Sequence, residues 1–269
     1  MNRKGARVNK AQLRLNEMCL NNFQKGKLGE RMGAAFDECT LADRKGNVLN
    51  AAKTTEKRQA KKCDSLDVLP PFAYTGAETV NAAAVNGALT LTYELFGGAQ
   101  RDADNGRAVC DAPRVTDGRA VCDADVGLPT SPSKLEVPQC QLQMLKSAGK
   151  LEKTVLKQVN KAKKRALKDE AVNSAAALGN ELMAVFSSDD KISRAEAKLV
   201  KSVDKKCDDL DEALDTVFAG SCGDPVLSDV EDCVIAAARC QSCLKINAFD
   251  ALNLDCDQAD DQNANGSCP

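Results

Sequence analysis

Thirteen cysteines in a chain of 269 residues constrain the fold of this protein more than any other feature of its sequence. A protein in a reducing compartment rarely carries so many thiols, because each one is open to oxidation. A zinc–thiolate site and reduced structural thiols are weaker alternatives, since the chain has no histidine and only Cys240 and Cys243 have the Cys-x-x-Cys spacing of zinc ligands. We therefore predict disulfides in an extracellular or cell-surface protein. The candidate disulfide cysteines are Cys19, Cys39, Cys63, Cys110, Cys122, Cys140, Cys207, Cys222, Cys233, Cys240, Cys243, Cys256 and Cys268.

The odd number of cysteines predicts that one thiol is free or pairs with another chain, or that a fourteenth cysteine lies upstream. Residues 1–20 contain no apolar segment of the kind found in signal peptides, so we expect the sequence to be that of a mature or truncated chain. Connectivity cannot be deduced from spacing alone. Our one pairing hypothesis is Cys19–Cys63, which would close a helical hairpin.

Apolar residues recur at helical spacing along most of the chain. One face is formed by Leu151, Val155 and further apolar residues up to Ala166. A second stripe begins at Ile192 and continues to Val217, so we expect one helix over 192–217. Alternation typical of strands is weak, and the prolines fall between the stripes. The predicted fold class is all-α.

The chain contains an internal duplication. The sequence Lys-Lys-Cys-Asp at 61–64 returns at 205–208, each time after a lysine-rich helical stretch. This repeat predicts two related helical units, residues 1–100 and residues 134–269, the second of which includes an acidic, cysteine-tied tail. Residues 101–133 are expected to be an irregular linker or insertion, with a short tandem repeat at 106–112 and 118–124.

Several segments carry a resemblance to other proteins: residues 4–12, Cys19, 61–63, 70–74, 80–84, 95–97 and 239–269, with the last as the most specific. Together they resemble an uncharacterised family of secreted, cysteine-rich bacterial proteins. The resemblance implies export, disulfides and an additional cysteine just before the position of Asn2. The family has no assigned activity, so the resemblance implies no catalytic residues.

Hard oxygen ligands are concentrated near the end of the chain, between two cysteines. Calcium takes six to eight oxygens, so a disulfide-tied acidic loop makes calcium a candidate ligand, although the spacing is not that of an EF-hand. A calcium-dependent extracellular binding module is therefore an alternative function. A solvated acidic tail is the simpler interpretation. The candidate ligands are Asp255, Asp257, Asp260, Asp261, Asn263 and Asn265.

Charge is segregated along the sequence. Residues 1–63 carry a net charge of +9, residues 134–168 carry +8, and residues 204–269 carry −11. Solvated helix faces are the simplest explanation. Head-to-tail self-association of basic and acidic regions into a filament, contact with another surface protein, and binding to anionic surface polymers are the alternatives. We expect no nucleic-acid partner, because no aromatic residues interleave with the lysines, and no membrane span, because no apolar run approaches 20 residues.

Ordinary catalytic equipment is missing from the sequence. The lack of histidine excludes histidine-containing triads, and no glycine-rich phosphate loop or Gly-x-Ser-x-Gly motif occurs. We therefore expect a non-enzymatic structural or interaction protein that requires no cofactor. A thiol–disulfide redox protein using Cys240 and Cys243 is an alternative, although Arg239 and Lys245 are the only cations close in sequence to activate a thiol.

Overall fold

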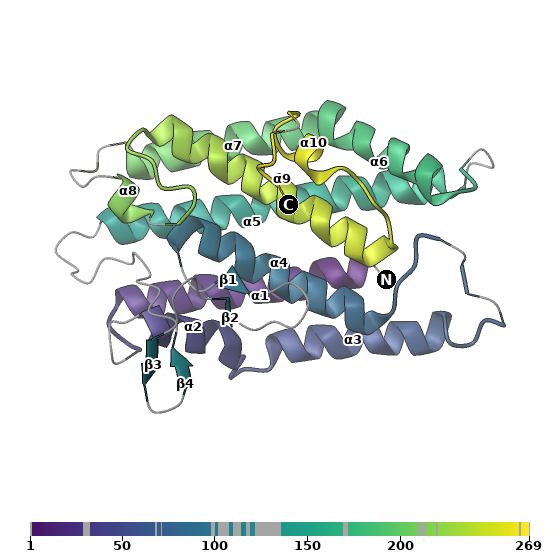
Figure 1. Cartoon of the computed structure of the whole chain (residues 1–269), viewed down its shortest axis with the longest axis horizontal. Helices are drawn as coiled ribbons and strands as arrows, with labels where there is room; N and C mark the ends of the chain where they lie inside the picture. The colour runs from purple at the N-terminus through teal and green to yellow at the C-terminus, as the bar shows by residue number, and fades with distance from the viewer. Residues whose placement is uncertain are drawn as a thin grey trace.

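Helices make up most of the described chain, which confirms the all-α prediction (Figure 1). The computed structural model describes residues 2–28, 33–67, 69–70, 72–97, 100–101, 108–109, 114–116, 119–121, 136–168, 172–208, 210, 214–218, 220–263 and 265–268. The helices within these ranges are α1 (Asn2–Gln24), α2 (Gly33–Ala42), α3 (Asn47–Lys62), α4 (Ala77–Phe96), α5 (Glu136–Ala166), α6 (Ala175–Ser188), α7 (Asp190–Cys207), α8 (Leu214–Val217), α9 (Leu227–Asp250) and α10 (Cys256–Asp260). In this part of the chain, no helix combines the length and the apolar character needed to cross a bilayer.

Four long helices surround the centre of the core. α1 packs against α4 and α5, and α9 packs against the same two helices. Their inward faces carry buried apolar side chains such as Val8, Leu91, Leu151 and Phe249, at the helical spacing that amphipathic sequence predicts. These faces join into one continuous core, which the remaining helices cover from outside.

The two halves of the chain use the same order of packing. α2 and α3 pack on α1 in the first half, and α6 and α7 pack on α5 in the second. α4 and α9 then take the corresponding places in the core. Because α1 also packs against α5 and α4 against α9, the halves share one core. The division into units 1–100 and 134–269 stays a prediction.

Short strands occur where the sequence predicts an irregular linker. β1 (Gln100–Arg101) pairs with β2 (Ala108–Val109), and β3 (Arg114–Thr116) pairs with β4 (Arg119–Val121), both antiparallel. The Arg-Ala-Val sequence of each tandem copy contributes to β2 and to β4. The β-branched valine in each copy favours this extended conformation. Apolar residues at helical spacing do not predict such short strands.

The prediction of a single helix over 192–217 is wrong. α7 ends at Cys207, and α8 is a separate short helix. Asp208 directly follows α7 and places negative charge at the C-terminus of the helix, where the helix dipole is also negative. This repulsion opposes extension of the helix, although the apolar spacing continues.

Within the described residues, ten cysteines form five disulfides, as the sequence predicts. The pairs are Cys19–Cys39, Cys140–Cys207, Cys222–Cys233, Cys240–Cys268 and Cys243–Cys256. Cys110 and Cys122 lie outside the described residues.

The predicted Cys19–Cys63 pair is wrong, because Cys19 bonds to Cys39 and Cys63 is a free thiol. Figure 1 shows α1 and α3 running in opposite directions, so the end of α1 that carries Cys19 lies beside the start of α3. Cys63 follows the far end of α3, about 24 Å away at the rise of an α-helix. α2 instead folds back on α1 and brings Cys39 to Cys19, with 5.7 Å between their Cα atoms.

Candidate functional site

A groove of about 740 Å³ lies between α5 and α7, and we call it the α5/α7 groove. Its other lining residues are uncharged, so no carboxylate lines it among the described residues. Its surface is therefore strongly positive. The seven cations that line it are Lys150, Lys157, Lys191, Arg194, Lys198, Lys201 and Lys205.

Helical periodicity places the α7 cations in one row. They recur every three or four residues from Lys191 to Lys205, the spacing that keeps side chains on one helix face. The other face of α7 packs into the core through Ile192, Leu199 and Val203. The same sequence pattern thus buries one side of the helix and directs the cations toward solvent.

Polar uncharged side chains lie between the two rows of charge. The hydroxyls of Ser147 on α5 and Ser202 on α7 are hydrogen-bonded at 2.9 Å across the groove. Thr154 and the nearly buried Gln158 also line it. Within the described chain, the one ion pair of a groove cation joins Arg194 to Asp190 at 3.8 Å, and both side chains are exposed.

A second groove, of about 270 Å³, lies between α1 and α5, and we call it the α1/α5 groove. Lys150 lines both grooves, so they meet on α5. The pKa of Lys10 is lowered, chiefly by Arg14 and then by Lys153, because like charges are crowded there. The lining includes one carboxylate, Glu17, whose pKa is raised by burial although neighbouring cations oppose this shift. The cations of this groove are Lys10, Arg14, Lys146, Lys150 and Lys153.

The candidate calcium ligands lie within α10 and on either side of it, and the four carboxylates among them accept hydrogen bonds from the same segment. Asp255 caps α10 by accepting from the Gln258 backbone N–H at 3.0 Å. Asp257 accepts from the backbone N–H groups of Gly266 and Cys268, and these bonds lower its pKa.

The remaining candidate ligands also form hydrogen bonds within this segment, and Asn263 does so as a donor. Asp260 accepts from the Ser267 hydroxyl at 2.7 Å, and burial raises the pKa of this carboxyl. Asp261 accepts from the backbone N–H of Asn263 and from the side-chain amide of Asn265, both at 2.8 Å. Among the described residues, no group of three or more potential metal-ligating His, Cys, Asp or Glu side chains is found. Calcium binding stays a prediction.

Cys240 and Cys243 are both buried on α9 and are bonded to different partners in the tail, Cys268 and Cys256. The redox interpretation requires a disulfide between Cys240 and Cys243, and the structure does not contain this bond. The Arg239 guanidinium interacts with other groups than these two sulfurs. Its guanidinium donates to the backbone oxygens of Phe186 and Ala259 and pairs with Glu196 at 2.9 Å.

Sequence reasoning missed a buried charged cluster at the centre of the four-helix core. The Lys245 ammonium of α9 forms an ion pair with Glu152 of α5, and Glu152 also accepts from the Asn9 side chain at 2.7 Å. Burial lowers the pKa of Lys245 to about 7, while Glu94 acts in the opposite direction. Glu94 accepts from Gln241 at 3.0 Å, and its own burial raises its pKa to about 7. The interruption of an apolar run by Gly87, opposite Lys245, is the one sequence signal of this cluster.

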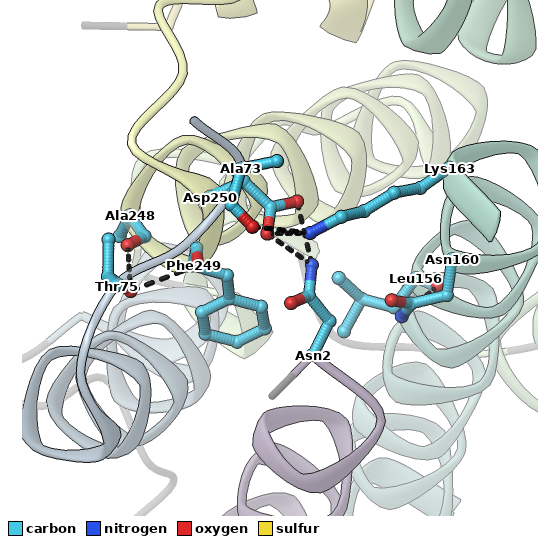
Figure 2. A network of polar contacts seen from close by, with 9 residues as sticks. All are labelled: Asn2, Ala73, Thr75, Leu156, Asn160, Lys163, Ala248, Phe249 and Asp250. Atoms are coloured by element: carbon cyan, nitrogen blue, oxygen red, sulfur yellow. Dashed lines mark hydrogen bonds and ion pairs between the residues drawn. The ribbon is translucent and has the colours of Figure 1, made fainter. Parts of the chain in front are cut away.

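A second buried network closes one end of the core (Figure 2). The Asp250 carboxylate accepts from both Lys163 of α5 and Asn2 of α1, and the Lys163 ammonium also donates to the Ala73 backbone oxygen at 3.0 Å. Burial raises the pKa of Asp250, while Lys163 and Asn2 act against that shift. Thr75 adds hydrogen bonds to the last turn of α9. The network joins three core helices and the segment before α4, so we interpret it as structural.

Comparisons of the chain with family models, with curated proteins and with solved structures return no match. The resemblance to secreted, cysteine-rich bacterial proteins therefore stays a prediction.

Proposed function

We propose that this protein is a non-enzymatic, exported interaction protein that binds an anionic partner through the α5/α7 groove. The observation that carries the proposal is the groove lining, in which seven cations face no carboxylate among the described residues. A chain with a net charge of −2 has enough acidic residues to neutralise such a surface internally. None of the acidic residues in the described chain lines the groove, so the concentration of positive charge there favours an external anion.

The walls of the groove support this proposal because they are held together covalently. The Cys140–Cys207 disulfide joins α5 to α7 close to Lys205, with 5.0 Å between the Cα atoms. A groove whose walls are fixed before binding loses less conformational entropy when a ligand arrives. Five disulfides in the described chain also favour an oxidising, extracellular location.

Self-assembly is a second candidate. An acidic group where α7 and α9 meet includes Asp204, Asp208 and Asp232. The pKa of the neighbouring Glu231 is raised to about 7, first by burial of its carboxyl and then by these negative charges. This group would be the complement of the basic grooves on another copy, in a head-to-tail contact that need not close into a ring. Light scattering at low and high salt tests it, because assembly driven by charge must disappear as salt screens the contact.

The experiment for the anion-binding function is elution from a resin that carries sulfopropyl groups. The test variant is Arg194→Gln/Lys198→Gln/Lys201→Gln in the groove. The control variant is Lys53→Gln/Lys57→Gln/Arg58→Gln on α3, where all three side chains are exposed. Both variants lose three positive charges, so the proposal expects the groove variant alone to elute at clearly lower salt. Equal elution of the two variants would mean that net charge, and not the groove, governs binding.

A further inference from the structure

We infer that the α5/α7 and α1/α5 grooves form one continuous track for a linear acidic polysaccharide, an inference that rests on the proposed anion-binding function. The two grooves meet at Lys150, which lines both. An anionic chain can therefore pass from α7 across α5 to α1 without leaving positively charged surface.

The cations are arranged in rows whose dimensions suit an extended ligand. The α7 row from Lys191 to Lys205 extends about 21 Å, and the α5 row from Lys146 to Lys157 extends about 16 Å, at the rise of an α-helix. Neighbouring cations in a row are about 5–6 Å apart at their Cβ atoms. This distance is closer to the distance between charges in a polymer with one charge per sugar unit than to the distance between adjacent phosphoryl groups in polyphosphate.

The lining between the rows also favours a sugar polymer. Thr154 and Ser202 bring partly exposed hydroxyls to the lining, and each hydroxyl oxygen can accept a hydrogen bond from a sugar hydroxyl. No aromatic side chain lines either groove among the described residues, so nucleobases would find no stacking surface.

A protein partner is disfavoured by the same lining. The centres of protein–protein interfaces are enriched in aromatic residues and depleted of lysine, whereas lysine dominates both grooves. A second copy of this chain is accordingly the weaker occupant of the track.

Binding of sulfated oligosaccharides by calorimetry tests the inference, with one oligosaccharide short enough for a single groove and one long enough to span both. The long chain should bind about tenfold more tightly at low salt, and its affinity should fall more steeply with salt, because more contacts release more counterions. Lys10→Gln/Arg14→Gln should reduce the affinity for the long chain toward that for the short one and leave short-chain binding unchanged. Arg194→Gln/Lys198→Gln/Lys201→Gln should weaken both and lower the salt slope by about three.

The controls separate the track from the underlying function. The Lys53→Gln/Lys57→Gln/Arg58→Gln variant should bind both oligosaccharides like the unmodified protein, and circular dichroism should show the same helicity for every variant. Equal affinity for long and short chains would overturn the track but leave anion binding in place. Tighter binding of polyphosphate or duplex DNA at matched charge would overturn the choice of a polysaccharide. Absence of binding to every anion would overturn the proposed function itself.

Discussion

The side chain of Lys245 on α9 occupies the space that a β-carbon on Gly87 of α4 would need. Glycine at this position lets a charged side chain lie between two core helices and reach Glu152 on a third. The centre of the core is therefore specified by a pair of residues that are 158 positions apart in the sequence.

Gly87→Ala should lower the free energy of unfolding by about 2 kcal/mol, measured by chemical denaturation. Alanine favours a helix by about 1 kcal/mol over glycine, but the displaced Lys245 would lose its buried contact with Glu152, and overpacking adds to the cost. Gly179→Ala on α6 is the matched control, because its nearest neighbour would be a movable methyl group of Leu254 at 3.3 Å. A Gly87→Ala protein as stable as the unmodified one would contradict the assignment of this contact.

Because of the raised pKa of Glu94, the free energy of unfolding should fall as pH rises from about 4.5 to about 7. Its pKa is raised to about 7 in the folded protein, so the folded state holds a proton in this range that the unfolded state has lost. The full loss would be up to about 3 kcal/mol for this buried carboxyl. Glu94→Gln should flatten the corresponding part of the stability–pH curve, measured by denaturant titration at several pH values. An unchanged curve would mean that Glu94 does not titrate in this range.

Removal of the Cys140–Cys207 disulfide should weaken both the fold and the groove. Cys140→Ala/Cys207→Ala should destabilise the protein by about 4 kcal/mol and reduce affinity for the long sulfated oligosaccharide, because α5 and α7 would no longer be fixed before binding. Cys222→Ala/Cys233→Ala is the control, with an expected loss of about 3 kcal/mol and no change in affinity. If both pairs change the affinity equally, the disulfide has no specific role in the groove.

Thiol labelling should distinguish Cys63 from the paired cysteines. Alkylation of the denatured but unreduced protein should modify Cys63 and leave the ten disulfide cysteines of the described chain unmodified, as read by peptide mass spectrometry. Labelling of Cys39 together with Cys19 would be incompatible with the disulfide between α1 and α2.

The sequence predicts features that depend on spacing along one helix. The stripe of Leu151, Val155 and Val159 correctly identifies the buried face of α5, and the disulfides follow from composition. The end of α7 could not be read from apolar spacing, because the charge on Asp208 opposes a helical pattern that continues to Val217 in the sequence.

Features that depend on contacts between helices could not be predicted in the same way. Glu152 and Lys245 look like ordinary solvent-facing charges in a local pattern, and only the packing of α5 against α9 brings them together. Likewise, the α7 row of cations can be read from the sequence, but its position opposite Lys150 and Lys157 requires the fold.

Lysine footprinting tests the anion-binding groove most directly. The protein is acetylated with and without the long sulfated oligosaccharide, and the rate at each lysine is read by mass spectrometry. Binding in the α5/α7 groove predicts that Lys150, Lys198 and Lys201 react more slowly when the oligosaccharide is present, while Lys53 and Lys57 on α3 react at unchanged rates. Equal protection of all lysines, or protection of the α3 lysines alone, would contradict it.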